Sequence, residues 1–389
     1  MKKIVFTGGG TGGHIYPGLA VVDELKKLSS DNGCEPFEII WIASKKKIDR
    51  DIIEKAGTVD RLYRVPCGKL RRYLSFENFI DLFRIAGGFF ASFFILLKEK
   101  PVFLFSKGGF VSVPPCIAAR LLHIPVFTHE CDVSPGLATR LNAKSARKVL
   151  VSFDKTPSFF SEDKRKNVVV TGNPVRPVFY SADAAKGREF LGFNSIPEAG
   201  EKPLLLVAGG SLGAQQINTL VTENLDWLCK SWKVVHQTGA LWAEEHPEMM
   251  EKGYHEDYYP YAFIYAEMPD VLKAADVVLS RAGANFLWEA SVSAKPLILI
   301  PLSGSGTRGD QVDNAALFAS KDAAIVLGGR DGDGNVTAPA DEDGLRSALE
   351  KFSNCEAREK AGKASRSIMP DAKPAETIAK LIFSEVNDK

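Results

Sequence analysis

Short apolar runs recur along the chain, and almost every run ends at glycine or at small polar residues. Runs of roughly four to eight apolar residues are typical of strands that are buried on both faces of a parallel sheet. Helical patterns follow several of these runs, so the chain predicts strands that alternate with helices. The expected strands lie within residues 4–6, 37–44, 102–109, 124–130, 147–153, 167–174, 202–210, 232–239, 275–283 and 295–301.

One pattern occurs twice: an apolar strand runs into a glycine-rich loop, and a helix and another strand follow. The loops read GGGTGGH at residues 8–14 and GGSLG at 209–213. Strand, helix and strand form the unit of a parallel, doubly wound sheet. We therefore predict an α/β protein of two Rossmann-like domains that face each other across a cleft, at residues 1–180 and 181–368, with a loop-like stretch at 193–203 near the boundary.

The composition is that of an ordinary soluble protein, and 389 residues are too many for one ordinary core. The net charge of +1 leaves no basic excess for phosphates, which excludes a general nucleic-acid binder. The six cysteines are scattered without a Cys-x-x-Cys pair, as expected for reduced thiols in the cytosol. The first apolar run breaks at Gly8, which predicts a first strand and not a signal peptide.

The segment 69–98 is unusually apolar and aromatic. Its uncharged part, 85–97, has 13 residues, and a membrane span needs ~20, so we expect no spanning helix. One interpretation is a buried helix that leads into the next strand. Another is a surface that rests on an anionic bilayer, and both hold if the later part is core and the earlier part is exposed. The residues of that surface are Lys69, Arg71, Arg72, Phe76, Phe79 and Phe83.

The two glycine loops are candidate phosphate sites. Ligands of such folds bind at the carboxyl ends of the strands, where backbone N–H groups and a helix start attract anions. Ser211 adds a hydroxyl donor to the second loop. Neither loop has the lysine of a Gly-x-x-x-x-Gly-Lys-Ser/Thr phosphate loop, and neither fits the dinucleotide fingerprint. One such loop is often only a tight turn, but a pair at matching places favours a phosphate-bearing ligand.

Four polar clusters also follow predicted strands, at the edge where such sheets bind ligands. Each residue alone is equally consistent with a helix cap or a solvated face. The clusters comprise His129, Glu130 and Asp132, then Arg176 between two prolines, then Glu289 after a small-residue loop, and Asp310, Gln311 and Asn314.

These motifs resemble the MurG family. The sequence contains GGTGGH, KGGFVSVP, THE, GNPVR, GGSLGA, HQTG, ADVVLSRAGA and DQVDNA in this order. The family comprises bacterial N-acetylglucosaminyltransferases that convert lipid I to lipid II in peptidoglycan synthesis. The resemblance implies a GT-B fold whose N-terminal domain takes the lipid acceptor and whose C-terminal domain takes UDP-GlcNAc. It also implies a terminal helix, at 369–389, that packs back on the N-terminal domain.

The resemblance implies roles for individual residues. His14 is the candidate catalytic base, with Glu130 and Asp132 as alternatives. Glu289 would bind the ribose hydroxyls, and Ser211 would lie near the diphosphate. A direct displacement would invert the anomeric centre. The full set implied at the donor is Thr11, Gly12, Gly13, Asp132, Arg176, Ser211, Tyr265, Ala284, Asn285, Phe286, Glu289 and Gln311.

The chain departs from the usual family pattern at several of these positions. Asp132 replaces an amide, and an ionised acid cannot donate a hydrogen bond. Phe110 replaces a frequent tyrosine and has no hydroxyl. Asn285 and Phe286 replace a more typical Leu-Thr pair, and Asp310 stands where glutamine or histidine is usual. These changes put the individual contacts in doubt and leave the donor class unchanged.

The implied partners are UDP-GlcNAc, undecaprenyl-linked lipid I and the anionic cytoplasmic face of the cell membrane, and other cell-wall synthesis proteins are further candidates. No nucleic acid, cofactor or protein-bound metal is expected. The stretch 331–342 partly imitates a calcium loop, but Val336 and Pro339 do not fit. Alternatives are another enzyme that uses a UDP-sugar, such as a glycolipid glycosyltransferase or an epimerase, and a non-catalytic nucleotide-sugar scaffold.

Overall fold

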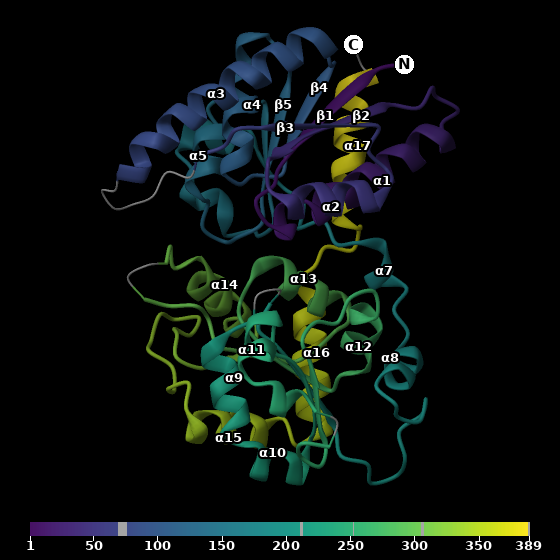
Figure 1. Ribbon diagram of the computed structural model, residues 1–389, viewed down its shortest axis with the longest axis vertical. Coiled ribbons are helices and arrows are strands. Elements are labelled where there is room, and N and C mark those ends of the chain that lie inside the picture. The colour runs from purple at the N-terminus through teal and green to yellow at the C-terminus, as the bar shows by residue number, and fades with distance from the viewer. Residues whose placement is uncertain (69–75, 211–212, 252, 305–306, 388–389) are drawn as a thin grey trace. The chain divides into compact units, whose positions relative to one another are not determined.

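The computed structural model describes residues 1–68, 76–210, 213–251, 253–304 and 307–387, and the side chains of 76–78 are outside this description. The chain divides into two compact units (Figure 1). The first unit comprises Met1–Arg176 and Pro370–Lys389, and the second comprises Pro177–Met369. Each unit is built around its own parallel sheet.

The sheet of the first unit has seven strands among the described residues, in the order β3-β2-β1-β4-β5-β6-β7, and all neighbours pair in parallel. Every residue of β2, β4 and β5 is buried, as expected for strands covered on both faces. The strands are β1 (Lys3–Thr7), β2 (Glu38–Ser44), β3 (Arg61–Val65), β4 (Phe103–Ser106), β5 (Val126–Glu130), β6 (Lys148–Val151) and β7 (Val168–Val170).

Two layers of helices cover this sheet. Alternate residues of β1 point to opposite faces, so Ile4 and Phe6 pack with α1 while Val5 packs with α3 and α4. The helices are α1 (Tyr16–Asp31), α2 (Lys47–Ala56), α3 (Phe76–Glu99), α4 (Val113–Leu121), α5 (Leu137–Asn142), α6 (Glu162–Arg165) and α17 (Pro374–Asn387), with short 3-10 turns η1 (Gly12–His14), η2 (Phe110–Ser112) and η3 (Thr156–Phe159).

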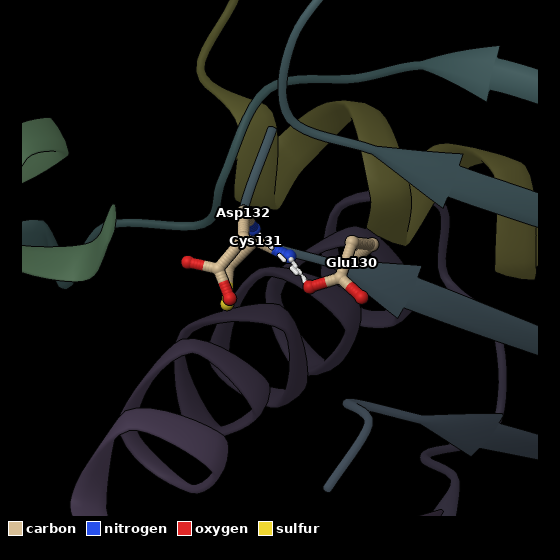
Figure 2. A group of neighbouring side chains, drawn as sticks. All are labelled: Glu130, Cys131 and Asp132. Atoms are coloured by element: carbon tan, nitrogen blue, oxygen red, sulfur yellow. Dashed lines mark hydrogen bonds between the residues drawn. The ribbon is translucent and has the colours of Figure 1, made fainter. Parts of the chain in front are cut away.

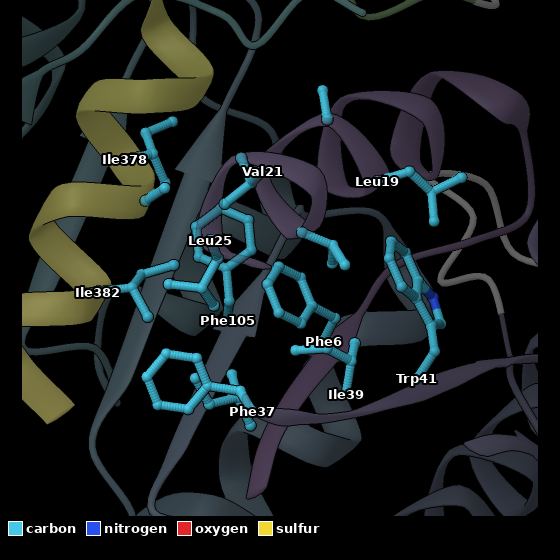
Figure 3. Close-up of a cluster of buried hydrophobic side chains, with 14 of the residues drawn as sticks. Phe6, Leu19, Val21, Leu25, Phe37, Ile39, Trp41, Phe105, Ile378 and Ile382 are labelled. Carbon is cyan, nitrogen blue, oxygen red and sulfur yellow. The ribbon is translucent and has the colours of Figure 1, made fainter. Parts of the chain in front are cut away.

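The C-terminal helix α17 belongs to the first unit, which confirms the expected return of the chain. It packs against α1, and Figure 3 shows Ile378 and Ile382 on the same buried cluster as Leu25. Ile378 and Ile382 are fully buried. Burying an isoleucine side chain is worth ~1.5–3 kcal/mol, so α17 is part of the core of this unit.

The helix α3 corrects one expectation. It has 24 residues, and its part Phe79–Glu99 is long and apolar enough, by length and composition alone, to cross a membrane. One face is buried in the first unit, through Ser92 and Leu96. A stripe on the other face is 44–64% exposed and consists of Phe79, Phe83, Phe90, Phe94 and Leu97. The prediction of a buried helix is therefore correct for one face and wrong for the other.

The second unit repeats the design with a sheet of six strands among its described residues, in the order β10-β9-β8-β11-β12-β13. Neighbouring strands again pair in parallel. The strands are β8 (Leu204–Ala208), β9 (Lys233–Gln237), β10 (Tyr258–Tyr261), β11 (Val277–Ser280), β12 (Leu297–Leu299) and β13 (Ala324–Val326).

Helices flank this second sheet, and its core combines residues of β8 and β11 with residues of α9 and α15. The helices are α7 (Pro177–Tyr180), α8 (Ala184–Phe190), α9 (Gln215–Thr222), α10 (Leu225–Ser231), α11 (Ala240–Glu245), α12 (Met268–Ala274), α13 (Ala284–Val292), α14 (Asp310–Ala319), α15 (Glu342–Lys351) and α16 (Cys355–Ser367), with the 3-10 turn η4 (Pro247–Met250).

The strand order of each sheet determines where the candidate ligand-binding loops lie. In each sheet the order reverses between the first and fourth strands, which are β1 and β4 in one unit and β8 and β11 in the other. Open parallel sheets bind ligands at such a switch point, beyond the carboxyl ends of the strands. The glycine loops follow β1 and β8, and the KGG and RAGA loops follow β4 and β11. All four loops therefore leave their sheets at the switch points.

Candidate active site

Side chains of β2 and α2 hold the backbone of the first glycine loop through hydrogen bonds. The indole Nε1 of Trp41, fully buried in β2, donates to the carbonyl of Gly8 over 3.0 Å. The backbone N–H of Gly10 donates to the carboxylate of Asp49, with both oxygens at 2.9 Å. Beyond this anchored part, Thr11 is exposed and a 3-10 turn brings the chain to His14. These hydrogen bonds fix the backbone at Gly8 and Gly10, and the predicted site residues Thr11 to His14 follow directly in the chain.

His14 lies against the loop that follows β4. A methyl group added to Gly109 would be 2.9 Å from Cδ2 of the His14 ring, closer than real contacts allow. Gly109 also has a φ of +76°, which side-chain-bearing residues rarely adopt. The imidazole and the Gly109 backbone therefore touch, and the structure brings together two loops that are almost a hundred residues apart in sequence.

Glu130 is the last residue of β5, and Cys131 and Asp132 begin the loop that follows (Figure 2). One carboxylate oxygen of Glu130 accepts from the N–H groups of Cys131 and Asp132, at 3.0 and 3.1 Å. The other oxygen accepts from Gly136 at 2.8 Å. Glu130 is 5% exposed. Its carboxylate thus shapes its own loop, whereas Asp132 is half-buried at the rim.

His129 is buried just before this loop. Its Nε2 lies 3.0 Å from the carbonyl of Gly172, and a carbonyl can only accept, so Nε2 carries the proton. Burial, and then the positive charge of Lys107, hold the pKa of His129 well below its usual value. His129 is therefore neutral. Lys107 is itself 1% exposed, and its ammonium has no hydrogen-bond partner in the described part of the chain.

Arg176 lies beside the first glycine loop. Its guanidinium carbon is 4.9 Å from the centre of the Tyr16 ring, within the range of a cation–π contact. The same ring lies against Gly12, because a methyl group on Gly12 would be 3.0 Å from it. The structure thus brings Arg176 close to the first glycine loop, and the resemblance had assigned both to the donor.

In the second unit, Gln237 at the end of β9 connects two predicted donor segments. Its Nε2 donates to the carbonyl of Gly210 in the second glycine loop, over 3.4 Å. Its Oε1 accepts from the N–H of Ile264 at 3.0 Å, next to Tyr265. Tyr265 itself is 70% exposed. Ser211, whose hydroxyl was predicted to lie near the diphosphate as a hydrogen-bond donor, lies outside the described residues.

The other predicted donor residues lie on α13 and α14. Asn314 of α14 donates to the carbonyl of Ala282, in the loop before α13, over 3.0 Å. The side-chain oxygen of Gln311 accepts from the N–H of Leu302 at 2.9 Å, which leaves its NH2 group to donate. Ala284 is buried at the start of α13, and the half-buried residues of that helix include Asn285, Phe286 and Glu289.

The predicted membrane residues are only partly described. Lys69, Arg71 and Arg72 lie outside the described residues, as does the side chain of Phe76. Phe79 and Phe83 are 58% and 64% exposed, and their rings meet edge to face with centres 5.0 Å apart.

One group of side chains in the described ranges has the geometry to hold a metal ion. The ligand atoms of Glu130, Cys131 and Asp132 lie within 4.8 Å of one another. Three backbone N–H groups already occupy the Glu130 carboxylate, however, and a carboxylate has about four acceptor positions. In the stretch 331–342, which partly imitates a calcium loop in sequence, the side chain of Asp331 accepts from the N–H groups of Asp333 and Asn335.

Sequence reasoning missed Asp49 and Gln237, which hold the glycine loops without belonging to them. Asp49 lies five residues after the end of β2, and Gln237 is the last residue of β9. A polar residue at the end of a predicted buried strand was the available signal for Gln237. Asp49 had none, because it is one charged residue among the many of a lysine-rich helix start.

Two Rossmann-like units, each with a glycine loop at the switch point of its sheet, match the GT-B fold. Two family models match the chain: the glycosyltransferase family 28 N-terminal domain over residues 4–151, and the corresponding C-terminal domain over residues 204–367. The chain belongs to the MurG family within glycosyltransferase family 28.

Curated relatives agree. The chain is 50% identical over 343 residues, 85% of each chain, to the UDP-N-acetylglucosamine–N-acetylmuramyl-(pentapeptide) pyrophosphoryl-undecaprenol N-acetylglucosamine transferase of Treponema denticola. It is 42% identical over 327 residues to a Clostridium botulinum protein of the same name, covering 84% of this chain and 86% of the relative.

Solved structures share the fold. The crystal structure of Acinetobacter baumannii MurG matches with a TM-score of 0.71 at 22% identity, over 99% of this chain and 100% of that one. The UDP-GlcNAc 2-epimerase of Neisseria meningitidis, bound to UDP-GlcNAc, matches with a TM-score of 0.64 at 13% identity, over 100% of both chains. At these identities the likeness concerns the fold alone.

Proposed function

We propose that the protein transfers GlcNAc from UDP-GlcNAc to the 4-hydroxyl of MurNAc-(pentapeptide)-pyrophosphoryl-undecaprenol, lipid I, and so forms lipid II for peptidoglycan. The observation that carries this proposal is the 50% identity, over 85% of both chains, to a transferase with these substrates in its name. The glycine loops at both switch points supply the anion-binding backbone that a diphosphate-linked donor needs.

In the first unit, His14 is the proposed general base. It would take the proton from the acceptor hydroxyl as that oxygen attacks the anomeric carbon. Its position between the first glycine loop and Gly109 supports this role, since both loops leave the switch point. The three backbone hydrogen bonds to Glu130 favour a loop-shaping role for that carboxylate, and Asp132 remains the alternative base.

In the second unit, the proposed donor residues lie in the segments that follow the carboxyl ends of the strands. Glu289 accepts from the ribose hydroxyls, the backbone at Tyr265 contacts the uracil, and Gln311 donates to the sugar from its NH2 group. The start of α13 contributes Ala284, Asn285 and Phe286, and Ser211 contributes its hydroxyl to the diphosphate. Arg176 adds a cation from the first unit, and Thr11, Gly12 and Gly13 line the reactive end of the donor.

The reaction is a single displacement. The acceptor oxygen forms a bond to the anomeric carbon while the bond to the UDP oxygen breaks, so an α-linked donor yields a β-linked product. Negative charge grows on the departing diphosphate, and backbone N–H groups, the start of a helix and a guanidinium stabilise it. These groups allow the transfer without a resident cofactor or metal ion.

The lipid acceptor also implies a place of action. We propose that the first unit docks reversibly on the anionic cytoplasmic face of the cell membrane. The exposed stripe of α3, with Phe83, Phe90 and Phe94, would enter the interface, and the basic residues at 69, 71 and 72 would meet lipid headgroups. The buried face of α3 keeps this helix on its own sheet, which favours docking over insertion.

Transfer of labelled GlcNAc to a short-chain lipid I analogue tests the activity. We expect one GlcNAc to be added per acceptor in β-linkage, with release of UDP. An epimerase would convert UDP-GlcNAc without the acceptor, and a scaffold would bind it without turnover. Binding of UDP-GlcNAc alone does not distinguish these alternatives, so the acceptor product is the deciding measurement.

A further inference from the structure

A buried carboxylate lies directly beneath the first glycine loop. Asp49, on α2, is fully buried. Its oxygens accept from the N–H of Gly10 at 2.9 Å, from the N–H of Ser44 at 3.1 Å and from the hydroxyl of Ser44 at 2.6 Å. Gly10 lies in the loop three residues after β1, and Ser44 is the last residue of β2. Asp49 therefore ties the first glycine loop to the neighbouring strand.

The fit between Asp49 and the loop is tight. A methyl group on Gly9 would be 2.3 Å from Oδ2 of Asp49, so the carboxylate fills the space that a side chain would need. From the same segment, the ammonium of Lys46 donates to the carbonyl of Gly10 over 3.3 Å. Both polar groups of the Gly10 residue are thus held by the β2–α2 segment.

This arrangement changes the role of the loop. A glycine-rich loop is expected to turn its N–H groups toward a phosphate. Here the N–H of Gly10 turns inward to Asp49, so it is a fixed anchor and not a ligand group. Thr11 follows directly, and the 3-10 turn carries the chain on to His14. The position of His14 is therefore set four residues after the anchor.

We propose that Asp49 is a positioning residue for the transfer reaction: it fixes the Gly10 backbone so that Thr11 to His14 meet the reacting centre. This inference rests on the proposed function. Asp49 itself touches neither substrate, so it acts through the loop. Misplacing a reactive group by about 1 Å can lower a rate by ~100-fold, which makes such an anchor consequential for turnover.

The chemistry of the site favours a carboxylate specifically. An ionised aspartate accepts on both oxygens and donates nothing. Asparagine at this position would keep one accepting oxygen but would turn an NH2 group toward N–H donors. The shape would be preserved while the anchor is weakened, so Asp49→Asn is the informative variant and Asp49→Ala the complete removal.

The test compares Asp49→Asn, Asp49→Ala and Ser44→Ala with the parent in steady-state transfer, UDP binding and thermal unfolding. Asp51→Asn on the exposed side of the same helix is the matched control. We expect kcat to fall ~10–100-fold in Asp49→Asn and further in Asp49→Ala. UDP affinity should stay within about twofold in the same variants, because the residues proposed for the uracil and the ribose belong to the second unit. Ser44→Ala should show a smaller loss of kcat, and Asp51→Asn none.

Hydrogen exchange of the peptide that covers residues 8–14 provides a second readout. Exchange at Gly10 should accelerate in Asp49→Asn and remain at the parent rate in Asp51→Asn. Normal kcat in a folded Asp49→Asn protein would overturn the proposal, as would a loss of kcat with unchanged exchange. If Asp49→Asn does not fold, a normal kcat in Ser44→Ala overturns it instead. An inactive parent would overturn the proposed function and this inference together, whereas an active parent with an unaffected Asp49→Asn overturns only the latter.

Discussion

The guanidinium of Arg176 rests on the face of the Tyr16 ring, 4.9 Å from its centre. Tyr16 is the first residue of α1, two residues after His14, which ends the 3-10 turn. Arg176 is the last residue of the N-terminal segment of the first unit, two residues after Pro174. The contact therefore orients a cation from the end of that segment toward the loop at its beginning.

Removing the aromatic face should loosen Arg176. An exposed cation–π contact contributes ~0.5–1 kcal/mol, which corresponds to a factor of ~2–5 in affinity. We expect Tyr16→Leu to raise the KM for UDP-GlcNAc by that factor, measured at saturating acceptor. Tyr16→Phe keeps the ring and should behave as the parent. Equal KM values for the parent and Tyr16→Leu would show that Arg176 needs no support from the ring.

His14→Ala should lower turnover by ~100-fold or more if His14 is the base, with little change in UDP affinity. Gly109→Ala should reproduce part of this loss, because the added methyl group would displace the imidazole ring. His255→Ala, at a surface ion pair with Asp226, is the control. Weakened donor binding with a near-normal rate in His14→Ala would instead assign this residue a positioning role.

Gln237 joins the second glycine loop to the segment before Tyr265. Gln237→Leu would leave the N–H of the buried Ile264 unpaired, at ~1–3 kcal/mol, so UDP affinity should fall about fivefold or more. Gln237→Glu still accepts from Ile264 but cannot donate to Gly210, and we expect an intermediate loss. Titration calorimetry with UDP measures both, with the exposed Gln216→Leu as control. Unchanged UDP affinity in Gln237→Leu would show that nucleotide binding does not depend on the link between the second glycine loop and the segment before Tyr265.

Reversible binding to anionic vesicles should have a salt-sensitive and a salt-resistant part. Changing Lys69, Arg71 and Arg72 to Glu removes the first, at ~1 kcal/mol for each basic residue, so binding should weaken by roughly 100-fold or more. Changing Phe90 and Phe94 to Ser should remove the second. Phe159→Ser, 36% exposed on the same unit, is the control. Vesicle sedimentation that is equal for all proteins would place the docking surface elsewhere.

Glu99, at the end of α3, predicts a pH-dependent stability. Hydrogen bonds from Lys3 and Tyr63 lower its pKa from 4.5 to about 2. A lowered folded pKa stabilises the fold above the unfolded value, so this contribution should be complete above about pH 5 and lost as the pH falls toward 2. Glu99→Gln should lower the free energy of unfolding by ~1–3 kcal/mol at pH 7. The difference from the parent should shrink between pH 5 and pH 3 in denaturant titrations, whereas the exposed Glu359→Gln should show no difference at any pH.

Much of the fold could be predicted from the apolar runs, because parallel strands covered on both faces must be almost continuously hydrophobic. All ten predicted runs contain a strand. The strands β3, β10 and β13 were missed. Arg61 and Arg64 make the edge strand β3 look polar, and Pro260 interrupts β10. The length of β13 does not explain why it was missed, because β7 and β12 are equally short and were predicted.

Two features could not be predicted from the sequence: which face of α3 is exposed, and which residues hold the glycine loops in place. Phe89 and Phe93 pack on the core while Phe90 and Phe94 are exposed, and no contrast of polarity distinguishes them in sequence. Ligand loops could be located from glycines because backbone geometry demands that residue. Asp49 could not, because its role depends on a contact with Gly10 that only the folded sheet creates.

The return of α17 to the first unit also governs how the chain is made. The residues before 177 leave the ribosome without the helix that covers the α1 side of their sheet, and Ile378 and Ile382 arrive only after the whole second unit. At ~5–20 residues per second, translation of the roughly 200 intervening residues takes ~10–40 s. During that interval an apolar face of the nascent first unit stays uncovered, so this is the period in which the growing chain would need a chaperone.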